Sequence, residues 1–260
     1  GQALVDAVAR VPALPERGQN VMASSWDVAA AGSVNILVAA ARSGADCVQA
    51  GVIGTGPNGD RVRAALAAEG GLSRAEDAAW VDELMRRGQW GQAYAHWAGS
   101  LRPGARLSPV FNPDFELPPS NSGFDWRIRP LPGQTVSIEH GVAGAQGAVA
   151  ALEFRRRPAA VAGLEQALLL APGQHTLKVR QRTDQLRSDA GLEWIVACGD
   201  GRVLGRSERF GGSADWHTLS APVQVPTDCP GQWLRLRNPA PTGRTRVTEG
   251  RLWSDRAWIV

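Results

Sequence analysis

A glycine-rich segment is the first pattern in the chain that could do chemistry. Gly54, Gly56 and Gly59 have the spacing GxGxxG, after an apolar run at 47–53 and before an amphipathic run at 60–69. A turn between a strand and a helix can hold a diphosphate with its backbone N–H groups. A dinucleotide-binding fold would continue into a second strand ending in an acidic residue, whereas this chain continues into further helical sequence. Nucleotide binding is therefore the weaker interpretation of these glycines.

Carbohydrate binding is a second possibility, because a pyranose ring stacks on an aromatic side chain while polar groups hold its hydroxyls. Trp126 and Trp216 each follow a turn, and Asp125, Asp215 and His217 stand beside them. We predict that these five residues contact the sugar. The alternative for the polar residues is turn capping, which is a common role of aspartate.

The sequence offers little support for catalysis or for a transition metal. Its four histidines lie outside GxSxG and HExxH contexts, and no CxxC or Cys/His cluster occurs. Cys198 and Cys229 flank strand-like runs, so a disulfide and a pair of buried thiols are both open. A disulfide closing that loop would contribute on the order of 3 kcal/mol and would favour an extracytoplasmic location.

Charge and hydropathy restrict the kinds of partner that the chain is expected to bind. The net charge is +3, with cations and anions interspersed, and the densest basic run, Arg155 to Arg157, is expected in a solvated turn. We therefore predict no nucleic-acid partner. No apolar stretch of about 18 residues occurs, and no cleavable leader follows Gly1, so we expect no membrane span and any signal peptide to have been removed.

The elements that position these residues fall into three segments. Residues 1–70 have α/β character, with a helix from Ser33 to Gly44 and the strand, turn and helix described above. Residues 72–104 form a helical hairpin. Its first helix begins with a capping box at Ser73 and Glu76 and ends at Gly88.

The second helix of the hairpin carries an aromatic stripe at Trp90, Tyr94, Trp97 and Leu101, which is more typical of a core than of a ligand surface. The hairpin resembles a single tetratricopeptide-like unit. We expect its stripe to pack on a neighbouring domain or on a protein partner.

Residues 105–260 are predicted to form an antiparallel β-sandwich, because short apolar or alternating runs are separated by Pro, Gly and Asp turns. Trp194 and Trp233 lie inside these runs and are predicted to be buried. The Asp200-Gly201 pair is predicted to be a hairpin turn. The expected strands are 135–139, 148–154, 175–182, 192–198, 219–225, 233–237 and 251–259.

Residues 1–70 resemble the start of the ribokinase-like (PfkB) carbohydrate kinases. The resemblance rests on Asp6 to Pro15, on Ala31-Gly-Ser-Val-Asn35 and on Gly51 to Gly59. It implies that Asp6, Gly32 and Asn35 contact sugar hydroxyls. The late glycine-rich anion hole of that family, with its catalytic Asp, has no counterpart, so phosphoryl transfer is not expected. The resemblance therefore implies a truncated kinase-like segment, and it predicts a fusion or chimeric protein.

Residues 105–260 resemble jelly-roll carbohydrate-binding modules of the galactose-binding-like type. The resemblance rests on Phe111 to Glu116, Phe124-Asp-Trp126, Ala214-Asp-Trp216 and Leu252-Trp-Ser-Asp255. In that family a structural calcium ion joins the first and last strands, and the resemblance implies Glu116 and Asp255 as its carboxylate ligands.

The favoured hypothesis is a noncatalytic module that binds carbohydrate or assists assembly in polysaccharide export, joined to the kinase-like segment. One alternative is a divergent sugar kinase of the PfkB type. Another is a protein-interaction scaffold, with partners on the helical hairpin or the kinase-like segment.

Overall fold

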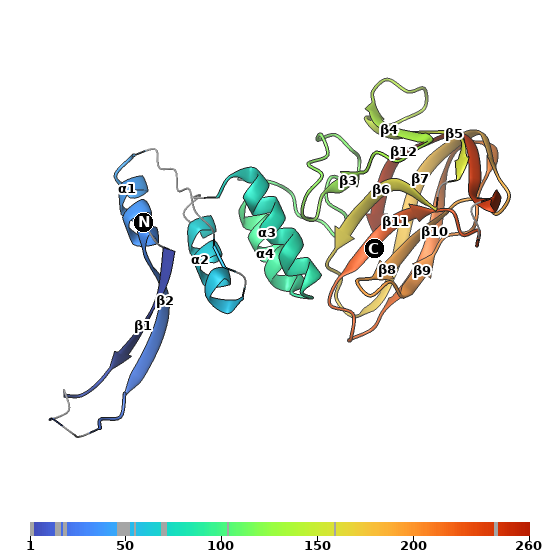
Figure 1. Cartoon of the computed structure of the whole chain (residues 1–260). Helices are drawn as coiled ribbons and strands as arrows, with labels where there is room; N and C mark the ends of the chain where they lie inside the picture. The colour runs from blue at the N-terminus through green and yellow to red at the C-terminus, as the bar shows by residue number, and fades with distance from the viewer. Residues whose placement is uncertain are drawn as a thin grey trace. The chain divides into compact units, whose positions relative to one another are not determined.

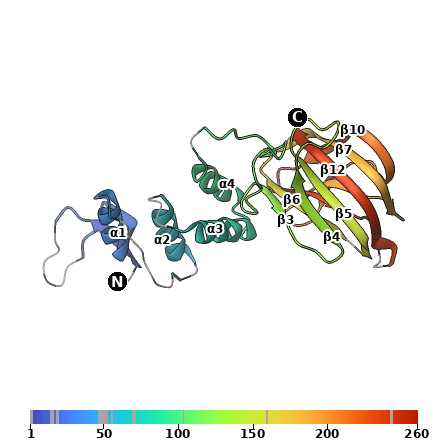
Figure 2. The same ribbon diagram turned by 90° about the horizontal axis from the view of Figure 1, so that it is seen from above.

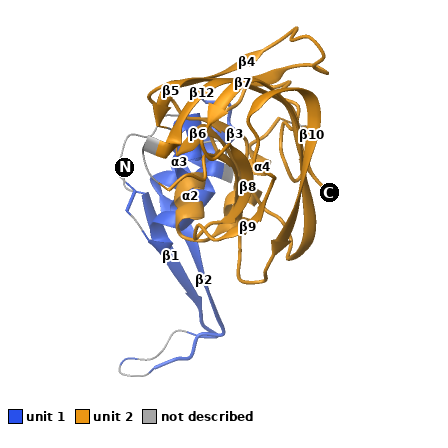
Figure 3. Cartoon of the chain, turned by 90° about the vertical axis from the view of Figure 1, so that its right-hand side faces the viewer, with its two compact units in different colours: residues 1–80 blue, residues 81–260 orange. Residues whose placement is uncertain are grey.

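The structure is a computed structural model that divides the chain into two compact units, Gly1–Trp80 and Val81–Val260 (Figure 3). The two units are described separately below. The residues whose structure is described are 3–13, 17, 20–45, 53–54, 56–68, 72–102, 104–158, 160–241 and 244–260.

The first unit contains a pair of antiparallel strands and two helices before the start of α3. Strands β1 (Ala3–Arg10) and β2 (Ser25–Gly32) pair antiparallel, and helices α1 (Ser33–Arg42) and α2 (Pro57–Ala68) pack on them around Val34, Val62 and Leu66. Both helices were expected from the sequence; the two strands were not. The strand expected at 47–53 lies outside the described residues, apart from Ile53, which is not in a strand.

Helices α3 (Arg74–Arg86) and α4 (Trp90–Gly99) confirm the two helices predicted for residues 72–104. The capping box is formed as expected: the Ser73 N–H and hydroxyl donate to Glu76 Oε2 at 2.9 and 2.6 Å, and the Glu76 N–H donates to Ser73 Oγ at 3.3 Å. These hydrogen bonds hold the pKa of Glu76 below its usual value. Gly88 follows α3 with φ of 77°, a left-handed conformation that glycine adopts readily.

The second unit is the predicted antiparallel β-sandwich. Its strands hydrogen-bond in the order β3-β6-β11-β8-β9-β10-β7-β12-β5-β4, and every pair is antiparallel. A single residue pair, Val223 with Gly205, links β9 to β10, and there the sheet folds into two layers (Figures 1 and 2). The strand bounds are β3 Trp126–Ile128, β4 Gln134–Glu139, β5 Val149–Pro158, β6 Val161–Leu168, β7 Gly173–Ser188, β8 Glu193–Cys198, β9 Val203–Arg206, β10 Gly212–Val225, β11 Gln232–Arg237 and β12 Val247–Ile259.

Alternating side chains from both layers form one core. On β7, Leu177, Val179 and Gln181 are buried, while the residues between them face outward. Because side chains of a strand alternate between faces, the outward residues line the solvent side of the sheet. The outer side of the layer formed by β10, β7, β12, β5 and β4 is called the β7–β12 face from here on.

Most of the strands follow the sequence expectation. All seven predicted runs are strands, and the Asp200-Gly201 turn joins β8 to β9 with Gly201 at φ of 92°. Strands β3, β6 and β9 were not expected. The prediction that Arg155 to Arg157 form a turn was wrong. They extend β5 and are exposed; Arg155 and Arg157 pair with β12, and Arg156 lies at a register shift between them.

The aromatic stripe of α4 packs on the sandwich. The Trp90 ring meets Trp233 edge to face at 5.8 Å, and Trp97 meets Phe111 in the same way at 5.0 Å. Gly231 lies so close to Trp90 that an added Cβ would stand 1.8 Å from the indole. The stripe is therefore part of the unit's core, as the sequence favoured. Trp233, predicted to be buried, is half-buried on the outer side of β11.

Cys198 and Cys229 form a disulfide with a Cα–Cα distance of 5.7 Å. Both residues are buried. Of the two possibilities left open by the sequence, the structure has the disulfide, which ties the end of β8 to the connection before β11.

Candidate functional site

The structure contradicts the prediction that Trp126 contacts sugar. Its side chain is 0% exposed and stacks on Phe115 at 4.8 Å, and its Nε1 donates to Asn112 O at 2.9 Å. The residue begins β3 on the inner side of the sheet, so its ring is a core element that a polysaccharide cannot reach.

Asp125 is also buried and performs the capping role given above as the alternative. Its carboxylate accepts N–H groups from Trp126 at 2.7 Å and from Ser120 at 2.8 Å. Burial raises its pKa above the ordinary value, although these hydrogen bonds act in the opposite direction. Neither Asp125 nor Trp126 is part of an accessible site.

Asp215 and Trp216 do line an open groove, of about 700 Å³, between β7 and β10. The Trp216 indole is half-buried; its Nε1 donates to Ala143 O at 2.9 Å, and the Arg180 guanidinium lies 4.8 Å from its ring. Asp215 is exposed and accepts the Trp216 N–H at 2.8 Å. The groove thus joins one aromatic ring to a carboxylate.

Two polar side chains of β7 near the groove face the inside of the sandwich. Thr183 is 3% exposed, and its Oγ1 has no hydrogen-bond partner among the described residues. Thr183 and Gln181 lie on the same side of β7 as the core residues Leu177 and Val179. The Gln181 Oε1 accepts the Trp194 Nε1–H at 3.0 Å in the core, so these two side chains do not present polar groups to a ligand in the groove.

His217, the fifth predicted residue, follows Trp216 and is half-buried. A ring nitrogen, Nδ1, lies 2.8 Å from Asp215 O, so the imidazole is held by the neighbouring backbone. Alternation along β10 places His217 on the opposite side from Trp216, near the rim of the sandwich. It does not line the groove.

Two further tryptophans extend the aromatic surface beyond the groove. Trp253 and Trp258 are half-buried on β12, and their cross-strand partners on β7 are Arg182 and Lys178. Neither was among the residues predicted from the sequence to contact sugar. The alternation of Trp253 with Leu252 and Ser254 indicates an outward side chain, but two bulges in β12 disturb the period and obscure the signal.

The expected calcium ligands come close to one backbone segment. Glu116 accepts the Ala148 N–H at 3.0 Å, and Asp255 accepts the Gln146 N–H at 3.3 Å. Asp255 also pairs with Arg180 through Oδ2, while its buried Oδ1 has no hydrogen-bond partner in the described part of the chain. The donor set fits calcium through Glu116 and this free oxygen, although Arg180 already supplies a positive charge there. Calcium stays a prediction.

Asp6, Gly32 and Asn35 all lie in the first unit. On the β1–β2 ladder Asp6 pairs with Ala29 and Gly32 pairs with Ala3, so Asp6 and Gly32 are three residue pairs apart. Gly32 caps α1 with φ of 67°, and Asn35 is exposed in the first turn of that helix. Their contact with sugar stays a prediction.

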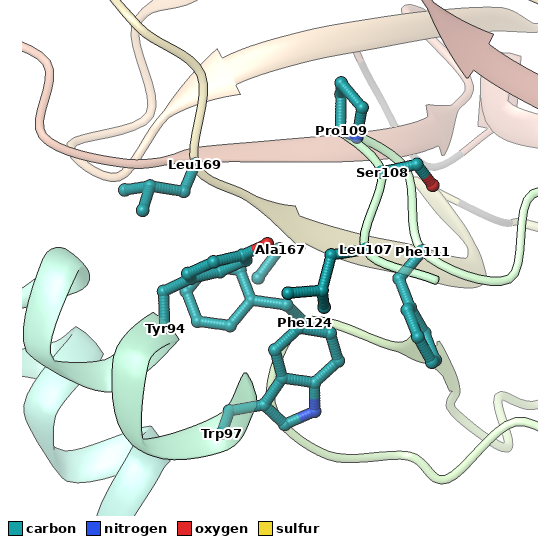
Figure 4. A pocket seen from close by; sticks show the side chains of 9 residues that line it. All are labelled: Tyr94, Trp97, Leu107, Ser108, Pro109, Phe111, Phe124, Ala167 and Leu169. Carbon is teal, nitrogen blue, oxygen red and sulfur yellow. The ribbon is translucent and has the colours of Figure 1, made fainter. Parts of the chain in front are cut away.

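A second cavity, of about 260 Å³, lies between α4 and the edge of the sandwich (Figure 4). Tyr94, Trp97, Phe111 and Phe124 form much of its wall and pack against one another. Partial burial raises the pKa of Tyr94. Because these rings pack against one another, we interpret the cavity as a gap in the packing between α4 and the sandwich and not as a ligand site.

The described residues were compared with what a metal site or a membrane-spanning helix requires. They contain no group of three or more His, Cys, Asp or Glu side chains placed to hold a metal ion. Within the same described part of the chain, no helix is long and apolar enough to cross a membrane.

Comparison with known proteins gives distant structural neighbours. No protein-family model and no curated protein matches the sequence. Among solved structures, the match with a carbohydrate-binding module of family 4 (CBM4) covers 58% of this chain and 97% of the module's chain. The sequence identity is 15% and the TM-score is 0.43. The CBM22-1 xylan-binding domain of Paenibacillus barcinonensis Xyn10C covers 56% of this chain and 90% of its own, with 14% identity and a TM-score of 0.38.

An arabinose-bound α-L-arabinofuranosidase, MgGH51, is similar over 62% of this chain and only 27% of its own, with 13% identity and a TM-score of 0.43. None of these neighbours is a ribokinase-like kinase or a tetratricopeptide protein. At such low similarity, the function of this chain has to be inferred from its own side chains.

Proposed function

We propose that the chain is a noncatalytic carbohydrate-binding protein whose second unit binds polysaccharide on the β7–β12 face. The observation that carries the proposal is the groove at Trp216, in which an aromatic ring, the Asp215 carboxylate and the Arg182 guanidinium lie together. A sugar offers an apolar ring face together with hydroxyls that both donate and accept, which this combination suits.

Trp253 supports an extended ligand. It stands on the neighbouring strand on the far side of β7 from Trp216, and Arg182 lies 5.4 Å from its ring. A surface with a ring on either side of one strand suits a chain of sugars better than a single sugar. The disulfide fits an extracytoplasmic location, because such bonds persist in oxidising compartments. A role in assembly during polysaccharide export stays a prediction that the same face would serve.

The test is affinity gel electrophoresis of the full-length chain in gels containing neutral or acidic polysaccharides. We expect at least one polymer to retard the protein, and Trp216→Ala and Trp253→Ala each to weaken the retardation by about tenfold, as for the loss of a stacking ring. Trp26→Ala is the matched control, because Trp26 is 69% exposed in the first unit and its loss should change nothing.

Absence of retardation on every polymer would refute the proposal. Equal retardation of the wild type, Trp216→Ala and Trp253→Ala would refute it as well. The same protein is assayed for ATP consumption with free sugars. Turnover there would support the sugar-kinase alternative instead.

A further inference from the structure

The outer side of β7 carries a row of cations. Lys178, Arg180 and Arg182 occupy alternate positions, so all three side chains leave the same face at intervals of about 7 Å. On the neighbouring strand Arg256 pairs with Arg180 in the ladder and adds a fourth cation to the row.

The cations alternate with tryptophans. The Arg180 guanidinium lies 4.8 Å from the ring of Trp216, and that of Arg256 lies 5.3 Å from the ring of Trp258. Arg182 stands 5.4 Å from the Trp253 ring in the same way. A guanidinium resting on an indole is held in place by the ring yet keeps its N–H donors free to bind an anion.

Three of the four cations have no anionic partner. Arg180 pairs with the buried Asp255, but among the described residues no carboxylate lies within salt-bridge distance of Lys178, Arg182 or Arg256. Lys178 and Arg182 are half-buried, so part of their hydration is already lost. A cation in this state gains most from a ligand oxyanion.

Several arginines of the opposite layer, in contrast, have carboxylate partners. There Glu165 pairs with Arg129 at 2.6 Å and with Arg235 at 2.7 Å. Glu193, whose side chain is 1% exposed, pairs with Arg237 at 2.7 Å. Each of these arginines is neutralised within the fold.

We propose that the β7–β12 face binds an acidic polysaccharide, whose carboxylate or sulfate groups pair with Lys178, Arg182 and Arg256 while its sugar rings lie against the tryptophans. The inference rests on the proposed function and specifies its substrate class. Two carboxylates of the same surface, Asp184 and Asp215, line the groove and can hold hydroxyls. A third, Glu139, accepts the Trp253 Nε1–H at 3.4 Å.

The experiment compares polymers that differ only in charge, with the full-length chain in affinity gels. Polygalacturonate is compared with its methyl ester, and dextran sulfate with dextran, so the two pairs distinguish carboxylate from sulfate as the bound group. We expect one charged member to bind at least tenfold more tightly than its neutral counterpart, and added salt to remove the difference.

Substitutions in the two layers test whether the β7–β12 face is responsible for the preference for charged polymers. Arg182→Gln and Arg256→Gln should each lower affinity for the charged polymer by about tenfold, as expected for the loss of a charge-assisted contact. Arg129→Gln removes the same charge from the opposite layer and should leave the affinity unchanged. Thermal unfolding of each variant confirms that the fold is retained.

The outcomes separate this inference from the proposed function. Equal binding of charged and neutral polymers that depends on Trp216 would overturn the inference and leave the function standing. Binding of duplex DNA as tight as that of the acidic glycan, with equal losses in all three arginine variants, would identify unspecific charge attraction and would also overturn it. No binding to any glycan would refute both.

Discussion

The disulfide allows the stability of the second unit to be predicted quantitatively. Cys198 and Cys229 are separated by 31 positions in the sequence. In the chain-entropy model, cross-linking a loop of that length removes about 12 cal/mol/K from the unfolded chain, or about 3.7 kcal/mol at 25 °C. A single domain is stable by only about 5–15 kcal/mol, so reduction should remove a large part of the margin.

The perturbation is reduction of the wild type, compared with a Cys198→Ala, Cys229→Ala double variant. Urea unfolding is followed by tryptophan fluorescence, because Trp126 and Trp194 are fully buried in this core and report on its unfolding. We expect both samples to lose about 3–4 kcal/mol relative to the oxidised wild type. The double variant should lose somewhat more, because it also leaves small cavities.

Thiol titration of the denatured, unreduced protein is the independent check. Of the three cysteines, only Cys47 should react. Reaction of all three, or a stability loss below about 1 kcal/mol on reduction, would contradict the reasoning and restore the alternative of two buried thiols.

Three further predictions address the core, a helix cap and the expected metal. Trp126→Ala should destabilise the second unit by about 3–5 kcal/mol in urea unfolding, as for other large buried aromatics, and a loss under about 1 kcal/mol would contradict its burial. Ser73→Ala should cost about 1 kcal/mol near neutral pH by removing the helix cap. The pKa of Glu76 is lower in the folded than in the unfolded protein, so the ionised carboxylate stabilises the folded state above its unfolded pKa of about 4.3. This stabilisation is lost as the pH falls through the folded pKa. The difference in free energy of unfolding between the wild type and Ser73→Ala should therefore become smaller in acid. Calcium should raise the thermal unfolding temperature of the wild type, and Glu116→Gln or Asp255→Asn should abolish the increase; no response to either calcium or a chelator would refute the metal prediction.

The sequence alone was sufficient to predict the local structural elements of this chain. The helix cap at Ser73, the stop at Gly88 and the turn at Asp200-Gly201 depend on side chains within a few residues of one another, so their signals are present in short windows. The strand runs were also found, because their alternation reflects burial on one face. Strand β9 was missed because it is short and contains glycine, and β6 because its residues are buried on both sides in places.

The accessible site was harder to predict than the strands. Trp126 and Trp216 have the same local context, an aspartate before the indole and a strand after it. Only the layer order places the first ring in the core and the second on the outside. The partners of Arg182 and Arg256 are likewise set by the β7–β12 ladder, which joins segments about 70 residues apart and has no local signature.

The two layers of the sandwich differ in what covers their outer sides, and this difference indicates where a ligand can bind in the second unit. Trp90 of α4 packs on the outer side of β11 at Trp233, and Gly231 leaves the space that the indole needs. On that side Arg235 is paired with Glu165, and Arg237 is paired with Glu193. Covered by the helix and neutralised by its own carboxylates, that side has few free groups to offer a ligand. The β7–β12 face retains half-buried indoles, unpaired cations and the exposed Asp215 carboxylate, and a polymer carrying rings, charges and hydroxyls would bind all three.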